Sequence, residues 1–126
     1  MDDQQVRDRN VETVRRFYQS ERDRDLSMWV TFWHSDGRQT FPTMGSAATV
    51  AGIDALRAVT AEKFATRPPY GIGDRVSAFA DPRRVFVHLD LEFPGSPVFP
   101  IWCVFHFDDD GLVTEVEEMV DTGAGA

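Results

Sequence analysis

The C-terminal third of the chain reads VFVHLDLEF (residues 85–93), PGSP (94–97), VFPIWCVFHF (98–107), DDDG (108–111) and LVTEVEEMVD (112–121). The three longer stretches are rich in β-branched and aromatic residues, which favour strands. The two short stretches consist of residues that favour turns. Together they predict an antiparallel meander of three strands joined by short loops.

The last of these strands carries a carboxylate among apolar side chains. With the two-residue period of a strand, one face is expected to hold Leu112, Thr114, Val116, Glu118 and Val120. A carboxyl group in an apolar wall is costly unless it is paired, hydrogen-bonded or protonated, and burial tunes its pKa for proton transfer. Glu118 is therefore a candidate acid–base residue. The alternative is an edge strand with solvent on both faces.

The residues before this region favour helices followed by strands. The expected elements are a helix over residues 4–21, a short helix capped by Asp25, a turn at Asp36-Gly37, a strand over residues 38–41, a helix over residues 52–66 and a strand over residues 72–80. Helices followed by a mostly antiparallel sheet indicate the α+β class. We expect one domain over residues 1–126, with a fraying Gly-Ala tail after Asp121.

Composition and charge narrow the range of partners. The formal net charge is −8 and the pI is about 4.7, so we expect neither nucleic acid nor an anionic membrane as a partner. Charges of alternating sign in the first helix, Glu21 among them, indicate a solvated face. The single Cys103 argues against an intrachain disulfide and a cysteine-based zinc site. Without a long apolar run or a hydrophobic segment after Met1, we expect no membrane span, no signal peptide and a cytoplasmic location.

Several motifs in this order resemble the NTF2-like superfamily. They are Asn10-Val11-Glu12-Thr13-Val14-Arg15-Arg16-Phe17-Tyr18, Phe32-Trp33-His34-Ser35-Asp36-Gly37, Gly52-Ile53-Asp54-Ala55-Leu56, Phe107-Asp108-Asp109-Asp110-Gly111-Leu112-Val113 and Glu117-Glu118-Met119-Val120-Asp121. The resemblance covers nearly the whole chain and is strongest to the SnoaL-like and PhzA/PhzB-like small-molecule enzymes. It implies a cone-shaped α+β barrel in which three N-terminal helices pack on a curved, mostly antiparallel sheet. It also implies a homodimer formed through the outer face of the sheet.

The resemblance also suggests catalytic residues. The limonene-epoxide-hydrolase branch uses Arg-x-Asp on a middle strand and an aspartate on the last strand, and the matching residues here are His88-Leu89-Asp90 and Glu118. It thus implies an acid–base pair of Asp90 and Glu118, with His88 orienting or charge-balancing Asp90. From the alternation alone, Asp90 fits a solvated face equally well. The catalytic positions of ketosteroid isomerase correspond to Phe17, Phe41 and Cys103, so that constellation is absent.

The sequence also suggests which residues could bind a ligand or a metal ion. The candidate substrate-binding residues are Tyr18, Trp33, Phe41, Trp102 and Cys103, each of which also suits a core position. The stretch His88-x-Asp90-x-Glu92 aligns three possible metal ligands. Because alternate residues on a strand lie about 6–7 Å apart, we expect no metal site there.

The function expected from these features is a cofactor-independent general acid–base enzyme, of cyclase, isomerase, dehydratase or condensation type. Its substrate would be a small hydrophobic or aromatic metabolite of secondary metabolism. The alternatives are an epoxide or lactone hydrolase, a non-catalytic domain that binds a small molecule, and an assembly domain with a filled cavity.

Overall fold

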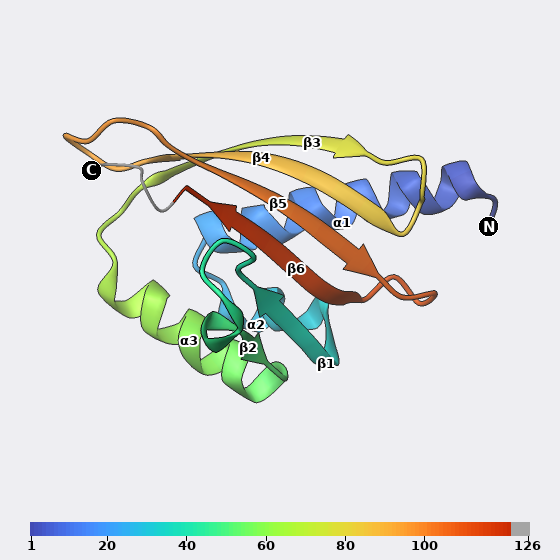
Figure 1. The fold of residues 1–126 in the computed structure, drawn as a ribbon, viewed down its shortest axis with the longest axis horizontal. Helices are drawn as coiled ribbons and strands as arrows, with labels where there is room; N and C mark the ends of the chain where they lie inside the picture. The colour runs from blue at the N-terminus through green and yellow to red at the C-terminus, as the bar shows by residue number, and fades with distance from the viewer. Residues whose placement is uncertain (122–126) are drawn as a thin grey trace.

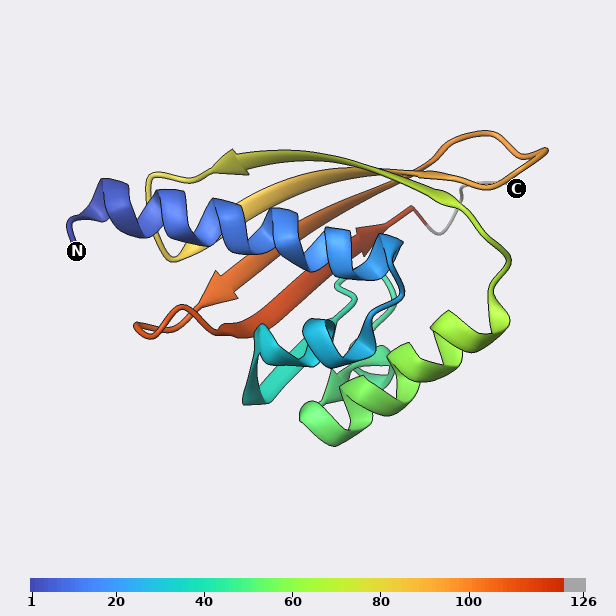
Figure 2. The ribbon, with the colours of Figure 1, turned by 180° about the vertical axis from the view of Figure 1, so that it is seen from behind.

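Six strands form one curved sheet, and three helices lie against its concave face (Figures 1 and 2). The computed structural model describes residues 1–121, so the tail that was expected to fray lies outside the described residues. The elements are α1 (Asp3–Arg22), α2 (Leu26–Thr31), β1 (Trp33–Thr40), the 3-10 helix η1 (Ser46–Ala48), β2 (Val50–Ala51), α3 (Ile53–Thr66), β3 (Gly71–Ala78), β4 (Arg84–Glu92), β5 (Phe99–Phe107) and β6 (Val113–Val120).

The strand order is β2-β1-β6-β5-β4-β3. Neighbouring strands are antiparallel except for β1 and β6, which pair in parallel. The expected meander is therefore confirmed as β4-β5-β6, and β3 extends it at one edge. The sheet curls around the helices without closing, so the fold is the expected α+β cone with an open side.

The first strand differs from its prediction. The sequence predicts a turn at Asp36-Gly37 followed by a strand over residues 38–41, whereas β1 already begins at Trp33. The register of β1 against β6 shifts between Trp33 and Arg38, so the predicted turn is an irregularity within a strand. Gly37 is required there because a Cβ atom would lie 2.6 Å from Cε3 of Trp33.

A second irregularity changes the faces of β6. Phe107 pairs with Val113, but the preceding His106 pairs with Glu115, which leaves Thr114 as an extra residue. The prediction that Leu112 and Thr114 share the face of Val116 is therefore wrong, and the fully buried Val113 takes that inner position. Beyond the bulge the prediction is confirmed: Val116, Glu118 and Val120 pair with the inward residues of β5.

Aromatic side chains fill the core between α1 and the sheet. Phe17 makes edge-on contact with Phe105 and Tyr18 and also packs against Trp29 and Trp33. These residues are buried, and Phe105 has no exposed surface. The aromatic core thus sits beside the middle strands, and the space beyond it is left for a cavity.

Polar contacts fix α1 along β3. Asn10 donates from Nδ2 to the carbonyl oxygen of Pro82 at 2.9 Å, and Arg22 bonds to the carbonyl oxygen of Ile72 and forms an ion pair with Asp74. These contacts hold both halves of the helix against the sheet edge. Figure 2 shows α1 running along β3. Within residues 1–121, no helix combines the length and the hydropathy that crossing a membrane requires.

Candidate active site

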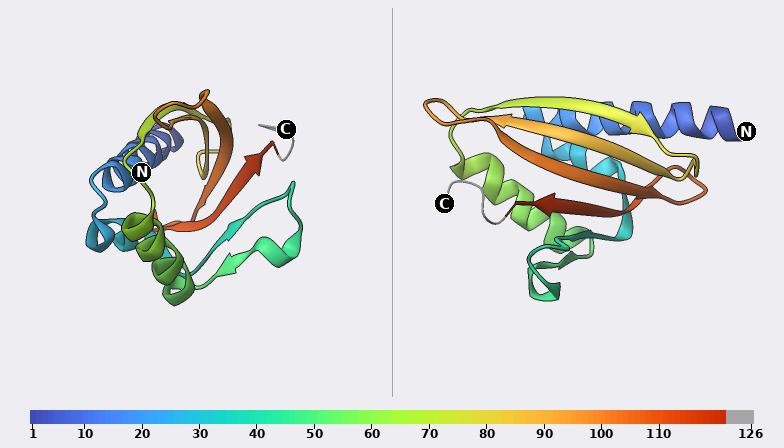
Figure 3. Two further views of the ribbon diagram at one scale, coloured as in Figure 1. Left: turned by 90° about the vertical axis from the view of Figure 1, so that its left-hand side faces the viewer. Right: turned by 45° about the horizontal axis from the view of Figure 1, so that its top comes forward.

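A cavity of about 390 Å³ opens at the end of the cone where α1 and α3 both end. The left panel of Figure 3 views this end, with the helices on one side and the sheet curving around the other. The cavity is lined by Tyr18, Glu21, Gln39, Phe41, Val59, Thr60, Lys63, Arg67, Tyr70, Leu89, Leu91, Phe93, Phe99, Ile101, Glu118 and Val120. The wall is apolar and aromatic apart from a small set of polar groups, as is typical of small-molecule sites.

Glu118 is the carboxylate that the sheet directs into this cavity. It stands opposite Cys103 on the inner face, and its Oε1 accepts a hydrogen bond from Nε2 of Gln39 at 2.6 Å. The other oxygen, Oε2, accepts no hydrogen bond from residues 1–121 and is therefore left to a ligand or water. Burial raises the pKa of Glu118 and Glu21 adds to the effect, while Lys63, Gln39 and Arg67 oppose it; the net pKa is raised.

An ion pair crosses the cavity wall beside Glu118. Nζ of Lys63 on α3 lies 3.3 Å from Oε1 of Glu21 at the end of α1, and the same oxygen accepts from Nε1 of Trp29. Burial lowers the pKa of Lys63, but Glu21, Tyr70 and Glu118 raise it by more, so the ammonium ion is retained. The expectation of a solvated Glu21 is wrong, because its side chain is only 12% exposed.

Tyr18 and Cys103 lie next to Glu118 and remain uncharged. Burial raises the pKa of Tyr18 well above its ordinary value, and the neighbouring Cys103, Glu21 and Glu118 add to the effect. Burial and then Glu118 raise the pKa of the Cys103 thiol well above its ordinary value. Tyr18 thus contributes a neutral phenol to the cavity wall, and Cys103 is an unreactive, fully buried thiol behind it.

The structure does not bring Asp90 to Glu118. Leu89 and Leu91 point into the cavity, so Asp90 between them projects from the opposite face of the sheet, as does His88. There Arg75 lies 3.4 Å from Asp90 and bonds to the imidazole of His88. The expected acid–base couple is wrong, because an entire sheet separates its two carboxylates.

The structure places only some of the predicted substrate-binding residues in the cavity wall. Tyr18 and Phe41 line the cavity. Trp33 is buried in the aromatic core, and Cys103 lies behind the wall. Trp102 lies on the outer face, 52% exposed, with its ring against Phe86 and His88, because it alternates with the inward Ile101 and Cys103. The structure therefore does not support a contact between Trp102 and a ligand in the cavity.

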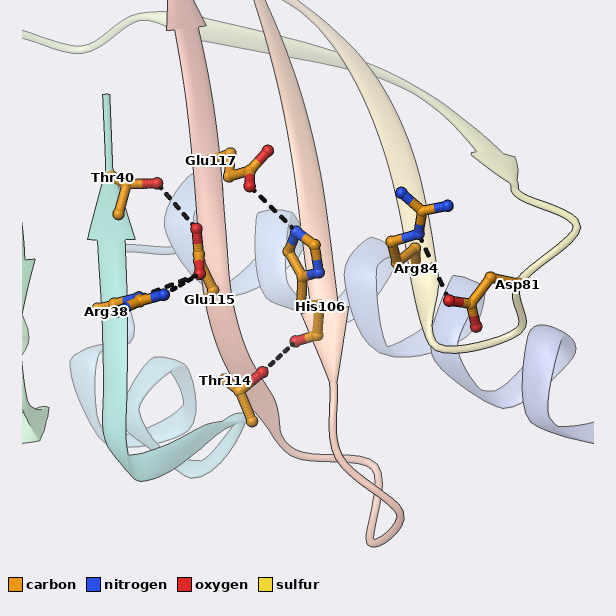
Figure 4. A network of polar contacts seen from close by, with 8 residues as sticks. All are labelled: Arg38, Thr40, Asp81, Arg84, His106, Thr114, Glu115 and Glu117. Atoms are coloured by element: carbon orange, nitrogen blue, oxygen red, sulfur yellow. Dashed lines mark hydrogen bonds and ion pairs between the residues drawn. The ribbon is translucent and has the colours of Figure 1, made fainter. Parts of the chain in front are cut away.

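The outer face carries the group of residues best suited to a metal ion within residues 1–121 (Figure 4). Ligand atoms of His106, Glu115 and Glu117 lie within 4.8 Å of one another. Glu115, however, already accepts hydrogen bonds from Arg38 at 2.8 Å and Thr40 at 3.1 Å. Burial raises the pKa of Glu115, and these bonds lower it by more, as expected for a carboxylate that is already paired with Arg38. The His88 stretch considered from sequence is not part of this group.

Sequence reasoning missed Glu21, Gln39, Lys63 and Arg67. The sequence contains a signal for two of them. Glu21 lies seven residues after the buried Val14, and Lys63 lies seven residues after the buried Leu56, so each is on the core-facing stripe of its helix. A charged residue at such a position indicates a polar group directed inward, by the same logic that selected Glu118.

The SnoaL-like domain profile matches residues 14–116, which is most of the chain. The chain belongs to the SnoaL-like family. No curated protein is detectably similar to it in sequence. The match spans the segments that build the cavity, from Tyr18 on α1 to Ile101 on β5, and ends just before Glu118.

Solved structures of similar fold cover nearly the whole chain. A candidate polyketide cyclase from Xanthomonas campestris pv. campestris is 17% identical, with a TM-score of 0.75 and coverage of 92% of this chain and 93% of that one. A candidate ketosteroid isomerase from Kribbella flavida is 14% identical, with a TM-score of 0.75 and coverage of 94% and 82%. Bal32a, from a soil-derived mobile gene cassette, is 20% identical, with a TM-score of 0.77 and coverage of 93% and 92%. At these identities the likeness establishes the fold alone.

The raised pKa of Glu118 predicts a pH-dependent effect on stability. Above the ordinary pKa of glutamate, about 4.3, the unfolded chain ionises Glu118 freely, whereas the folded chain resists ionisation. We therefore expect Glu118→Gln to raise the free energy of unfolding at neutral pH relative to wild type. The difference should shrink as the pH falls toward about 4. Urea denaturation at both pH values measures it.

The matched control for this measurement is Glu62→Gln, an exposed glutamate on α3. This variant should change the free energy of unfolding by less than about 0.5 kcal/mol at either pH. A Glu118→Gln variant that is less stable than wild type at neutral pH would show that the folded protein favours the ionised carboxylate, contrary to the prediction.

Proposed function

We propose that this protein is an enzyme that transfers protons within a small hydrophobic metabolite bound in the cavity, in a reaction of isomerase or cyclase type. The observation that supports this is Glu118, a carboxyl group held by Gln39 on an otherwise largely apolar wall, with one oxygen left for a ligand. Burial brings the pKa of such a group closer to the operating pH, which is what general acid–base catalysis requires.

The proposed step is proton transfer next to a carbonyl group. The Glu118 carboxylate removes a proton from the carbon beside the carbonyl, and negative charge develops on the carbonyl oxygen as the enolate forms. The ammonium ion of Lys63, on the same cavity wall, is the group suited to stabilise that charge. Glu118 then returns the proton to another atom of the same molecule, which regenerates the carboxylate and leaves the oxidation state unchanged.

The walls indicate the class of substrate. Phe99 of β5, Phe93 just after β4 and Tyr70 after α3 line the cavity, and Tyr70 stacks on Phe93 with their ring centroids 4.8 Å apart. Such walls favour a planar or ring-containing molecule of aromatic or polyketide type. The name of the Xanthomonas protein, a candidate polyketide cyclase, agrees with this assignment without establishing it.

The structure argues against one alternative function, hydrolysis, and leaves another, a non-catalytic binding domain, as a candidate. Epoxide or lactone hydrolysis of the limonene-epoxide-hydrolase type needs Asp90 and His88 beside Glu118, and neither Asp90 nor His88 lines the cavity. A non-catalytic binding domain needs only the cavity, so it remains the second candidate. The two candidates differ in whether Glu118 exchanges protons with the bound molecule.

Glu118→Gln should abolish proton exchange and leave the fold intact. The assay is deuterium incorporation from D₂O, followed by NMR, beside the carbonyl group of 2-tetralone and 1-phenylbutane-1,3-dione. Wild type should accelerate the exchange, and the variant should lose about 10²-fold or more, as is typical when an acid–base group is removed. The Gln39 hydrogen bond can persist, because the amide oxygen of glutamine can accept it.

Asp90→Asn is the matched control, because Asp90 lies on the outer face. It should exchange at the wild-type rate. Equal rates in wild type and Glu118→Gln would leave a binding domain as the better account, and a loss confined to Asp90→Asn would restore the site expected from the sequence.

We also propose that the outer sheet face joins two copies of the chain. Trp102 offers an exposed indole at its centre, and Met119 stands opposite it on β6. An ion pair of Arg75 and Asp90 and a polar pair of His106 and Glu117 flank this patch. A two-fold axis places such a patch against itself, so mixed charges and an apolar centre suit self-association.

Trp102→Glu should therefore shift the protein to monomers in sedimentation velocity, because it places two carboxylates in the apolar centre. Val98→Glu, at an equally exposed residue in the β4–β5 loop, is the control and should leave the dimer intact. Wild-type protein that sediments as a monomer would contradict the proposal.

A further inference from the structure

Arg67 is a cation placed where the cavity meets solvent. It is the C-cap residue of α3, exposed overall, and its side chain also contributes to the cavity wall. Its backbone is fixed, because Arg24 donates hydrogen bonds to the carbonyl oxygens of Phe64, Arg67 and Pro68. The guanidinium is thus carried by an anchored segment at the cavity opening.

Most arginine side chains in the described part of the chain have a hydrogen bond or an ion pair. Those of Arg22, Arg38, Arg75, Arg83 and Arg84 are each paired with a carboxylate, and those of Arg7, Arg9 and Arg24 donate to other oxygen atoms of the protein. Within residues 1–120, no hydrogen bond or ion pair is found for the Arg67 side chain, and only its backbone carbonyl oxygen accepts one. Arg67 is therefore available to an anion that enters from outside.

The charges inside the cavity favour an anion beside Arg67 at the opening and disfavour one deeper in the cavity, beside Glu118. Lys63 is paired with Glu21, and the proposed reaction assigns Lys63 to the carbonyl oxygen and Glu118 to the proton transfer, so neither group is available to a permanent anion. An anionic group beside Glu118 would repel it, whereas one at the opening would meet Arg67 and leave the rest of the molecule among apolar walls. The positive charge of Arg67 also reaches Glu118, since it opposes the rise of that pKa.

We propose that Arg67 binds an ionised carboxylate of the substrate. The substrate is then a hydrophobic acid whose carboxylate lies at the cavity opening and whose apolar part extends inward toward Glu118. This inference rests on the proposed function, because it takes the cavity to be the substrate site. A carboxylate fits the planar fork of an arginine through two parallel hydrogen bonds, and its single charge suits an opening that offers one unpaired guanidinium.

The test compares 2-naphthoate with 2-naphthamide, which have nearly the same shape and differ in charge. Isothermal titration calorimetry at neutral pH should show that wild type binds the acid about five- to tenfold more tightly than the amide, as expected for a partly exposed charge-assisted pair. Arg67→Gln should bind the two equally, with little change for the amide. Arg67→Lys should keep part of the preference, because it retains the charge and loses the fork.

Arg57→Gln is the matched control. Arg57 is an exposed arginine of α3 that does not line the cavity, so its removal changes the net charge equally and should preserve the preference for naphthoate. The proposal would be overturned if wild type bound the acid and the amide equally or bound neither. It would also be overturned if the preference for the acid survived in Arg67→Gln, or if Arg57→Gln lost the preference to the same extent. Because binding is measured without turnover, a naphthoate preference in a protein that does not exchange protons would refute the proposed function alone.

Discussion

The ion pair between Glu21 and Lys63 is the interaction on which the rest of the site depends. It joins the end of α1 to α3 across the cavity wall and keeps two charges there that are largely shielded from solvent. Removing either partner would leave a poorly solvated charge. The cost is below the roughly 3–5 kcal/mol of a fully buried pair, because the side chains of Lys63 and Glu21 are 22% and 12% exposed. The pair also sets the electrostatics at Glu118, because Glu21 raises the pKa of that carboxyl group and Lys63 lowers it.

One sheet carries two separate kinds of chemistry, because successive side chains of a strand point to opposite faces. The inner face of β6 presents Glu118 to the cavity, and its outer face presents Glu115 and Glu117 to arginine and histidine partners (Figure 4). The bulge at Thr114 changes only the start of β6, since a uniform register would have placed Val113 outside. Beyond it, the two-residue alternation of the strand decides which carboxylates are surrounded by apolar walls and which are paired on the surface.

The sequence predicted the parts of the fold that depend on local patterns. Alternation defined β4, β5 and β6 and identified Glu118 as an inward carboxylate. The bulge at Thr114 and the irregular β1 depend on pairing with neighbouring strands and leave no local signal. The alternation in β4 had already placed Asp90 opposite the apolar face, and the resemblance to an epoxide hydrolase outweighed it. Lys63 and Glu21 come from helices distant in sequence, so only their core-facing positions could have revealed them.

We propose that the cavity holds Glu118 as a carboxyl group tuned for proton transfer. A ¹³C NMR titration of its side-chain carboxyl carbon, assigned by comparison with the spectrum of Glu118→Gln, tests this. We expect a midpoint above the ordinary value for glutamate, because burial and Glu21 outweigh the favourable contacts of the charged form. A midpoint at or below the ordinary value would show a solvated or fully neutralised carboxylate and would contradict the proposed acid–base site.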